Sequence, residues 1–173
     1  VSHTLPGVAG VAARADSMDG TMEYVRVAPS PIFGPHDLPL TKPPYGRITA
    51  IDLKTGEHTW MVANGDGPRN HPMLRDLNLP PLGYSSRPVP LVTASLLFLG
   101  EGSNVIGGTS GEYQWGTKFR AYNKSTGEVG WETDLGLGTT GGPMTYMHDG
   151  KQYIVVPVGD LQHPPEWIAL GLP

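Results

Sequence analysis

The chain has 173 residues, a net charge of −4 and no cysteine. The slightly acidic balance, without a Lys/Arg cluster, argues against nucleic acid as a partner, and the absence of thiols excludes disulfides and thiolate metal sites. No run of 18 apolar residues is present in the sequence, so no membrane-spanning helix is predicted.

Glycine and proline shape the chain. There are 24 glycines and 18 prolines, together 42 of the 173 residues, and they are spread between short apolar runs. This distribution is typical of turn-rich β structure, and no window shows a helical apolar period that is free of Gly and Pro. We therefore expect an all-β protein without long helices. The first residue is Val1 rather than Met, and no signal-peptide pattern follows, which we interpret as a fragment or a processed product.

The first predicted strand is Met22–Val27, which follows a turn at Asp19–Gly20. We assign it to the end of a preceding repeat unit.

An internal repeat is the strongest feature of the sequence. Residues 50–60 read AIDLKTGEHTW and residues 121–131 read AYNKSTGEVGW, with five identities and one Asp/Asn pair at an offset of 71 residues. Each copy predicts a β-hairpin in which the Asp or Asn side chain caps the turn and the glycine adopts positive φ. The closing residues, Trp60 and Trp131, then lie on the return strand, where their rings fill space between neighbouring sheets.

Further strands follow each hairpin. After Trp60, a segment at 64–87 is rich in Asn, Pro and Gly, with a short helix and a packing role expected around His71. Two apolar runs, Val89–Thr93 and Leu96–Leu99, then predict a strand pair around a short turn.

The second hairpin is followed by a glycine loop at 136–142 and a strand at Pro143–Met147. The Asp149–Gly150 pair ahead of the strand Tyr153–Val158 is the best hairpin signal of the chain. A last strand is expected at Trp167–Leu170.

Four-stranded units that repeat with a signature tryptophan are typical of propeller blades. The predicted fold is therefore all-β, a partial β-propeller in a single domain over residues 1–173. We expect residues 1–37 to hold the end of a preceding blade and a linker, 38–100 a blade with an insertion, and 101–173 a blade and a closing segment.

Three strings carry a resemblance to a known family. KPPYGRITAIDLKTGEHTW (42–60), KFRAYNKSTGEVGW (118–131) and GGPMTYMHDGKQYIVVPVG (141–159) resemble the last blades of membrane-associated dehydrogenases that depend on pyrroloquinoline quinone (PQQ), of the glucose and quinate/shikimate type. The D-x-x-T-G-E-x-x-W element resembles the tryptophan-docking motif of quinoprotein propellers. The resemblance runs from about residue 38 to 160. It implies an eight-bladed propeller in the parent enzyme, of which this chain supplies two to three blades.

The resemblance also implies the chemistry of the parent. PQQ lies on the propeller axis with Ca²⁺ or Mg²⁺, a carboxylate base takes the substrate hydroxyl proton, and electrons leave for ubiquinone. It places the catalytic carboxylate and the metal ligands upstream, so no catalytic or metal-binding residue is assigned here. The partners that the resemblance implies are the remaining blades of the parent chain. It also implies a periplasmic location, in which other parts of the parent protein associate with the inner membrane. The chain alone is expected to be inactive.

By the same resemblance, residues at the start of each innermost strand line the cofactor site. These are Tyr84, Ser86 and Arg87 in one unit and Thr139 and Thr140 in the next. Arg87 suits a bidentate contact with a PQQ carboxylate. The alternatives are a solvated loop arginine, turn chemistry for the threonines and packing for Tyr84.

His163 falls where the resemblance places substrate-pocket residues, although an exposed tail histidine is the alternative, and Asp160 is expected to cap a turn. The predicted substrate is a sugar or cyclic polyol, which the KPPYGRIT string favours over methanol or ethanol. A non-enzymatic β-propeller scaffold for protein–protein interaction is the alternative function.

Overall fold

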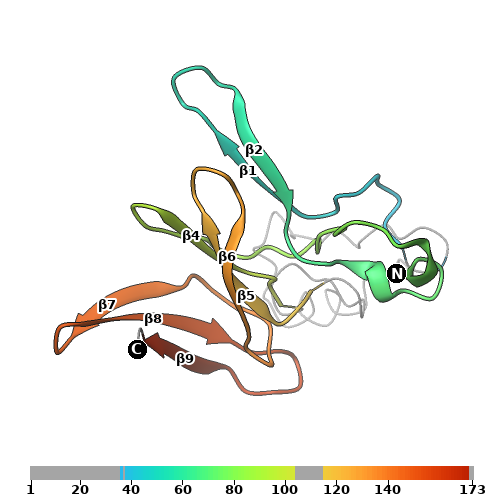
Figure 1. Ribbon diagram of the computed structural model, residues 1–173. Coiled ribbons are helices and arrows are strands. Elements are labelled where there is room, and N and C mark those ends of the chain that lie inside the picture. The colour runs from blue at the N-terminus through green and yellow to red at the C-terminus, as the bar shows by residue number, and fades with distance from the viewer. Residues whose placement is uncertain (1–35, 37, 104–114, 172–173) are drawn as a thin grey trace, which may run out of the picture. The chain divides into compact units, whose positions relative to one another are not determined.

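A computed structural model describes residues 36, 38–103 and 115–171, all within one compact unit, Phe33–Pro173. The expected strand Met22–Val27 lies outside the described residues. The described part is built from antiparallel strands and two short 3-10 helices, which confirms the all-β expectation (Figure 1). The strands are β1 (Arg47–Ile51), β2 (His58–Ala63), β3 (Leu91–Val92), β4 (Leu96–Gly100), β5 (Lys118–Asn123), β6 (Val129–Asp134), β7 (Met144–His148), β8 (Lys151–Val158) and β9 (Glu166–Gly171).

The strands form three sheets. The first pairs β1 with β2, the second has the order β3-β4-β5-β6, and the third has the order β7-β8-β9. The predicted boundary between two blades at residue 100 lies within the second sheet. There β4 pairs along its whole length with β5, from Leu96↔Asn123 to Gly100↔Phe119. Residues 64–90 are thus the connection from the first sheet to the second.

The two repeat hairpins have the same turn. The Asp52 carboxylate accepts a hydrogen bond from the Lys54 backbone N–H at 2.8 Å, and the Asn123 side chain accepts one from Ser125 at 2.9 Å. The turn glycines, Gly56 and Gly127, have φ values of 75° and 76°. The predicted side-chain caps and positive φ values are thus confirmed in both copies. Each hairpin also has a register shift just before the turn-capping Asp or Asn, between Ala50 and Ile51 in the first and between Ala121 and Tyr122 in the second.

The third sheet contains the other predicted hairpin. Asp149 and Gly150 have φ values of 47° and 74°, and His148 pairs with Lys151, as a two-residue turn between β7 and β8 requires. The last strand is present as β9, which pairs with β8.

Apolar packing joins the second and third sheets. Phe119, Val156 and Val158 are fully buried, and Phe98 and Ile168 pack against them. The rings of Phe98 and Phe119 are stacked with centroids 6.2 Å apart.

A tryptophan joins the first and second sheets. The Trp60 indole N–H donates to the carbonyl oxygen of Lys124 at 2.9 Å, across 64 residues of sequence. The ring lies over Gly127, where an added Cβ would come within 2.6 Å of its Cε3 atom. The tryptophan of the first hairpin is therefore docked on the turn of the second, as the prediction of a ring between sheets requires.

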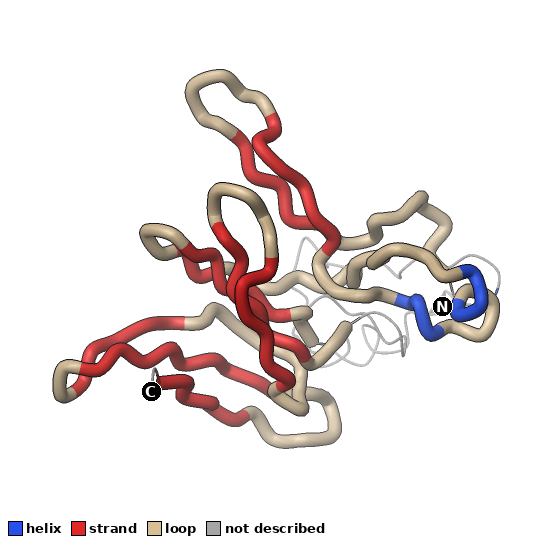
Figure 2. Tube along the Cα trace, in the orientation of Figure 1, coloured by secondary structure: helices blue, strands red, loops and turns tan. Residues whose placement is uncertain are grey.

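The antiparallel strands have two unlike ends. Short hairpin turns at 52–57, 93–95, 124–128 and 149–150 lie at one end, which we call the turn end. The longer described connections, 64–90, 135–143 and 159–165, leave from the other, the loop end, where β4 also ends and β5 begins (Figure 2). His71 is near the loop end between the 3-10 helices Pro68–Asn70 and Arg75–Leu77. It is buried and its Nε2 lies 2.9 Å from the His36 carbonyl oxygen, which confirms its packing role.

Candidate functional site

A short buried segment forms hydrogen bonds with several of the connections at the loop end. We call Gly100–Ser103, which begins at the last residue of β4, the connector. The Asn64 side-chain N–H donates to the Gly100 carbonyl at 3.1 Å, and the Ser86 hydroxyl donates to the Glu101 carbonyl. Toward the third sheet, the Gly102 N–H donates to the Thr139 hydroxyl at 3.2 Å, and the Ser103 hydroxyl donates to the Gly159 carbonyl at 2.7 Å. The connector, at the end of β4 in the second sheet, is therefore hydrogen-bonded to segments that flank the first and third sheets.

The connector carries a buried ion pair. The Arg120 Nη1 atom lies 2.6 Å from the Glu101 Oε1 atom, and the two side chains are 8% and 4% exposed. The second Glu101 oxygen accepts the Lys118 backbone N–H at 3.2 Å, and the Arg120 Nε atom lies 2.9 Å from a Glu132 oxygen. Burial raises the pKa of Glu101, and the charge of Arg120 opposes that rise.

Two glycines make room for this carboxylate. A Cβ on Gly65 would come within 2.5 Å of the Glu101 Oε1 atom, and a Cβ on Gly116 would overlap the Oε2 atom. Any side chain at either position would displace the carboxylate from Arg120. The glycines thus set the place of a charged pair that has little access to water.

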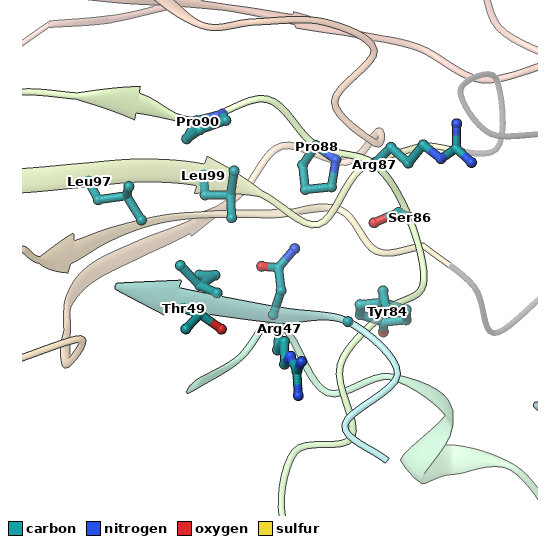
Figure 3. Close-up of a pocket in the computed structure, with 12 residues that line it drawn as sticks. Arg47, Thr49, Tyr84, Ser86, Arg87, Pro88, Pro90, Leu97 and Leu99 are labelled. Atoms are coloured by element: carbon teal, nitrogen blue, oxygen red, sulfur yellow. The ribbon is translucent and has the colours of Figure 1, made fainter. Parts of the chain in front are cut away.

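Tyr84, Ser86 and Arg87 follow one another along an extended stretch at the loop end, beside β1 (Figure 3). They line a pocket of about 410 Å³ together with Arg47 and Thr49. The structure thus brings together three of the five residues predicted to bind the cofactor.

The three side chains differ in how far they are free to contact a bound molecule. Burial, followed by the nearby Glu101 charge, raises the pKa of Tyr84 to about 12, so its phenol is neutral and can donate a hydrogen bond. The Ser86 hydroxyl is already engaged by the connector, whereas the Arg87 side chain is exposed. Arg87 can accordingly reach an anionic group at this end of the sheets.

Asn64 is a site residue that sequence reasoning missed. It lines the same pocket and is 3% exposed, and the Gly100 carbonyl fixes which way its amide points. Within the described part of the chain its Oδ1 atom has no hydrogen-bond donor. A buried acceptor of this kind accommodates a donor from water or a bound molecule. The one signal in the sequence is its position directly after the strand that carries Trp60.

The other predicted cofactor residues lie on the connection to the third sheet. Thr139 is 4% exposed and its hydroxyl accepts the Gly102 N–H, so it is held by the connector. The Thr140 backbone N–H donates to the Pro157 carbonyl at 2.9 Å. Neither threonine is among the residues that line the Tyr84 pocket.

His163 lies in the last long connection, beside Asp160. The Asp160 carboxylate accepts the backbone N–H groups of Gln162 and His163, both at 2.7 Å, which confirms its expected role as a turn cap. Its oxygens also lie 2.9 Å from the His163 Nδ1 atom, and the hydrogen bond with His163 lowers the pKa of Asp160. The His163 side chain itself is 59% exposed.

The described residues contain no group of three or more His, Cys, Asp or Glu side chains that could hold a metal ion. Nor does the described part contain a helix long and apolar enough to cross a membrane.

Comparison with known proteins gives consistent relatives. Residues 8–154 match the family described as "Glucose/ethanol/alcohol dehydrogenase, beta-propeller domain". The chain is 34% identical over 132 residues to the quinate/shikimate dehydrogenase (quinone) of Acinetobacter baylyi, and 35% identical over 137 residues to the quinoprotein glucose dehydrogenase of Escherichia coli. Each match covers 75% of this chain and 15% of the relative. The glycerol dehydrogenase large subunit of Gluconobacter thailandicus is 30% identical over 158 residues, which cover 89% of this chain and 19% of that protein.

The chain therefore spans less than a fifth of the length of these relatives. The match with a propeller domain, together with three successive antiparallel sheets, confirms the predicted partial β-propeller. The cofactor implied by the sequence resemblance, PQQ with a divalent cation, is that of the matched family. The chain belongs to the PQQ-dependent dehydrogenase family and forms part of its β-propeller domain.

Proposed function

We propose that this chain is part of an enzyme that oxidises a hydroxyl group of a sugar or cyclic polyol and delivers the electrons to a quinone in the periplasm. The observation that carries the proposal is the family match over residues 8–154. The names of two relatives support the substrate class and the acceptor, because one acts on quinate or shikimate with a quinone and another on glucose.

The residues at the loop end would take different roles toward the cofactor. PQQ, when bound, supplies the electrophile that accepts hydride. Arg87 is exposed and suits a charge-assisted contact with a carboxylate of PQQ, and Tyr84 is a neutral donor beside it. Ser86, Thr139 and Thr140 would hold the surrounding loops in place through the connector and β8.

His163 would contribute to the substrate pocket. Its pairing with the ionised Asp160 fixes the ring next to a capped turn. This arrangement suits a hydrogen bond to a substrate hydroxyl. The catalytic base and the cation ligands would come from the parts of the parent protein that this chain does not contain.

The test uses the full-length protein loaded with PQQ and Ca²⁺ or Mg²⁺. A dye acceptor should be reduced with glucose, quinate or shikimate, and methanol and ethanol should be poor substrates. Reduction with only the simple alcohols would reject the proposed substrate class. No PQQ binding would reject the enzymatic proposal and favour a scaffold. The 173-residue chain alone should show no turnover under the same conditions.

The role of Arg87 is tested by Arg87→Met in the same full-length protein. PQQ affinity should fall by about tenfold or more, since a charge-assisted bidentate contact is lost. Arg75→Met is the matched control, because Arg75 is exposed on the 3-10 helix and does not line the pocket. Equal affinities for the two variants would contradict the role of Arg87.

A further inference from the structure

Asn64 and Gly65 form the one Asn-Gly pair in the sequence. An asparagine carries a side-chain amide close to the backbone nitrogen of the next residue, and a following glycine places no Cβ beside that nitrogen. The nitrogen can therefore attack the amide carbon with little steric hindrance. An asparagine before glycine is consequently where a chain cyclises and loses its side-chain amide most readily.

The fold requires both members of this pair. The Asn64 side-chain N–H donates to the Gly100 carbonyl at 3.1 Å, which an ionised aspartate could not do. Gly65 has a φ of 83°, and an added Cβ would come within 2.5 Å of the Glu101 Oε1 atom. A bulkier neighbour that would shield the amide is thus excluded by the buried ion pair.

The folded chain holds Asn64 in place through its backbone as well. Its N–H donates to the Gly46 carbonyl at 3.0 Å, its carbonyl accepts the Tyr84 N–H at 2.9 Å, and the residue is 3% exposed. Cyclisation changes both the side-chain and the backbone torsions of Asn64, and its amide nitrogen must give up the Gly100 carbonyl. The reaction therefore requires these three hydrogen bonds to open.

We propose that Asn64 is a deamidation site that reacts when the junction between the first sheet and the connector opens. The Gly65 nitrogen forms a bond to the Asn64 Cγ atom, the Cγ–Nδ2 bond breaks, and Nδ2 leaves as ammonia with the proton that the Gly65 nitrogen gives up. Water then opens the cyclic imide at either of its carbonyl groups, which leaves aspartate or isoaspartate. The inference does not depend on the proposed enzymatic function.

The product cannot restore the junction. A carboxylate at position 64 turns an acceptor toward the Gly100 carbonyl, which is itself an acceptor, and adds a negative charge beside the segment that carries Glu101. Isoaspartate in addition lengthens the backbone between the groups that bond to Gly46 and Tyr84. An opening that ends in deamidation is thus irreversible.

The main test is peptide mass spectrometry of the 173-residue chain after incubation at mildly alkaline pH, with and without urea. The tryptic peptide 55–69 contains Asn64 and no other asparagine, and chromatography separates its deamidated forms. The folded chain should deamidate at Asn64 at least about tenfold more slowly than the chain in urea, because only its open fraction reacts. Equal rates would overturn the protection, and an Asn64 that does not react in urea would overturn the site.

Ser86→Ala connects the reaction with opening. It removes the hydrogen bond from the Ser86 hydroxyl to the Glu101 carbonyl, next to the bond that Asn64 makes to the connector. Deamidation of the folded chain should become about fivefold faster. Ser125→Ala is the matched control, because Ser125 is exposed at the turn end, and it should leave the rate unchanged. In urea both variants should react as the parent does, so an unchanged rate for folded Ser86→Ala, or an acceleration that persists in urea, would contradict the coupling.

Asn64→Asp reproduces the aspartate product directly. It should lower the ratio of folded to unfolded chain at neutral pH at least about tenfold relative to the parent. A protonated carboxyl can donate to the Gly100 carbonyl again, so this destabilisation should shrink as the pH falls. Asn78→Asp makes the same change at an exposed position and should alter stability little. If Asn64→Asp is as stable as the parent at neutral pH, the modification is not irreversible for the fold and the proposal fails.

Discussion

The docking of Trp60 on the Gly127 turn can be measured by comparing Gly127→Ala with Gly56→Ala. The two glycines have the same place in the repeat and φ values of 76° and 75°. They differ in one respect, because a Cβ would meet the Trp60 ring at 2.6 Å in the first case and nothing within 4 Å in the second. The sister turn therefore provides an internal reference for the cost of the backbone conformation.

The expected costs follow from this difference. Placing alanine at positive φ destabilises each turn by about 1 kcal/mol. Gly127→Ala also pushes the indole away, which loses its hydrogen bond to Lys124, about 1 kcal/mol, and re-exposes part of the ring, about another 1 kcal/mol. We expect the free energy of unfolding to fall by about 1 kcal/mol for Gly56→Ala and by about 3 kcal/mol for Gly127→Ala.

The assay is urea unfolding at low protein concentration. The urea concentration at the midpoint of unfolding is compared between the variants, whose m-values should be the same. Tryptophan fluorescence follows the same transition, and Gly127→Ala should make the Trp60 signal resemble that of a solvated indole before unfolding. Equal destabilisation of the two variants would refute the reasoning, because it would show that the Trp60 joint contributes no stability.

Three further outcomes concern the connector and its ion pairs. Glu101→Gln should destabilise the chain by about 3 kcal/mol in urea unfolding, because it removes one partner of a buried pair; a loss below about 1 kcal/mol would contradict this. The hydrogen bond with Lys118, followed by the contacts with Arg120, lowers the pKa of Glu132 from its ordinary value. The ionised Glu132 therefore stabilises the fold at neutral pH, and this contribution is lost as the pH falls through the lowered pKa. Glu132→Gln should therefore flatten the acid limb of the stability–pH curve by about 0.5 kcal/mol, and an unchanged limb would count against it. Thr139→Val should speed hydrogen exchange at the Gly102 amide, whose acceptor it removes, by about tenfold; unchanged exchange would show that the Thr139 bond is not the protecting one.

The local features of the fold were predictable because their causes are local. A Thr-Gly pair after Asp or Asn specifies its own turn through side-chain caps and positive φ, and the Asp149–Gly150 pair does the same for a two-residue hairpin. Which strands share a sheet is not local. The division at residue 100 missed the pairing of β4 with β5, because either neighbour of an isolated apolar run satisfies the same alternation pattern.

The residues of the candidate site likewise fall into those that local sequence predicts and those that depend on distant contacts. Tyr84, Ser86 and Arg87 precede a predicted strand, so their place at its start, and hence together, could be inferred. The connector could not, because Gly-Glu-Gly-Ser has the composition of an exposed turn, and only the meeting of three sheets buries it. Asn64 was missed for the same reason: its significance lies in the Gly100 carbonyl, 36 residues away.

The connector also has a consequence for how this protein loses its structure. Repetitive architectures in which each unit touches only the next usually melt piece by piece. Here four consecutive residues hold hydrogen bonds to segments that flank the first and third sheets, so either sheet must break some of these bonds when it detaches from the second. Heating should consequently release the three sheets in one cooperative step.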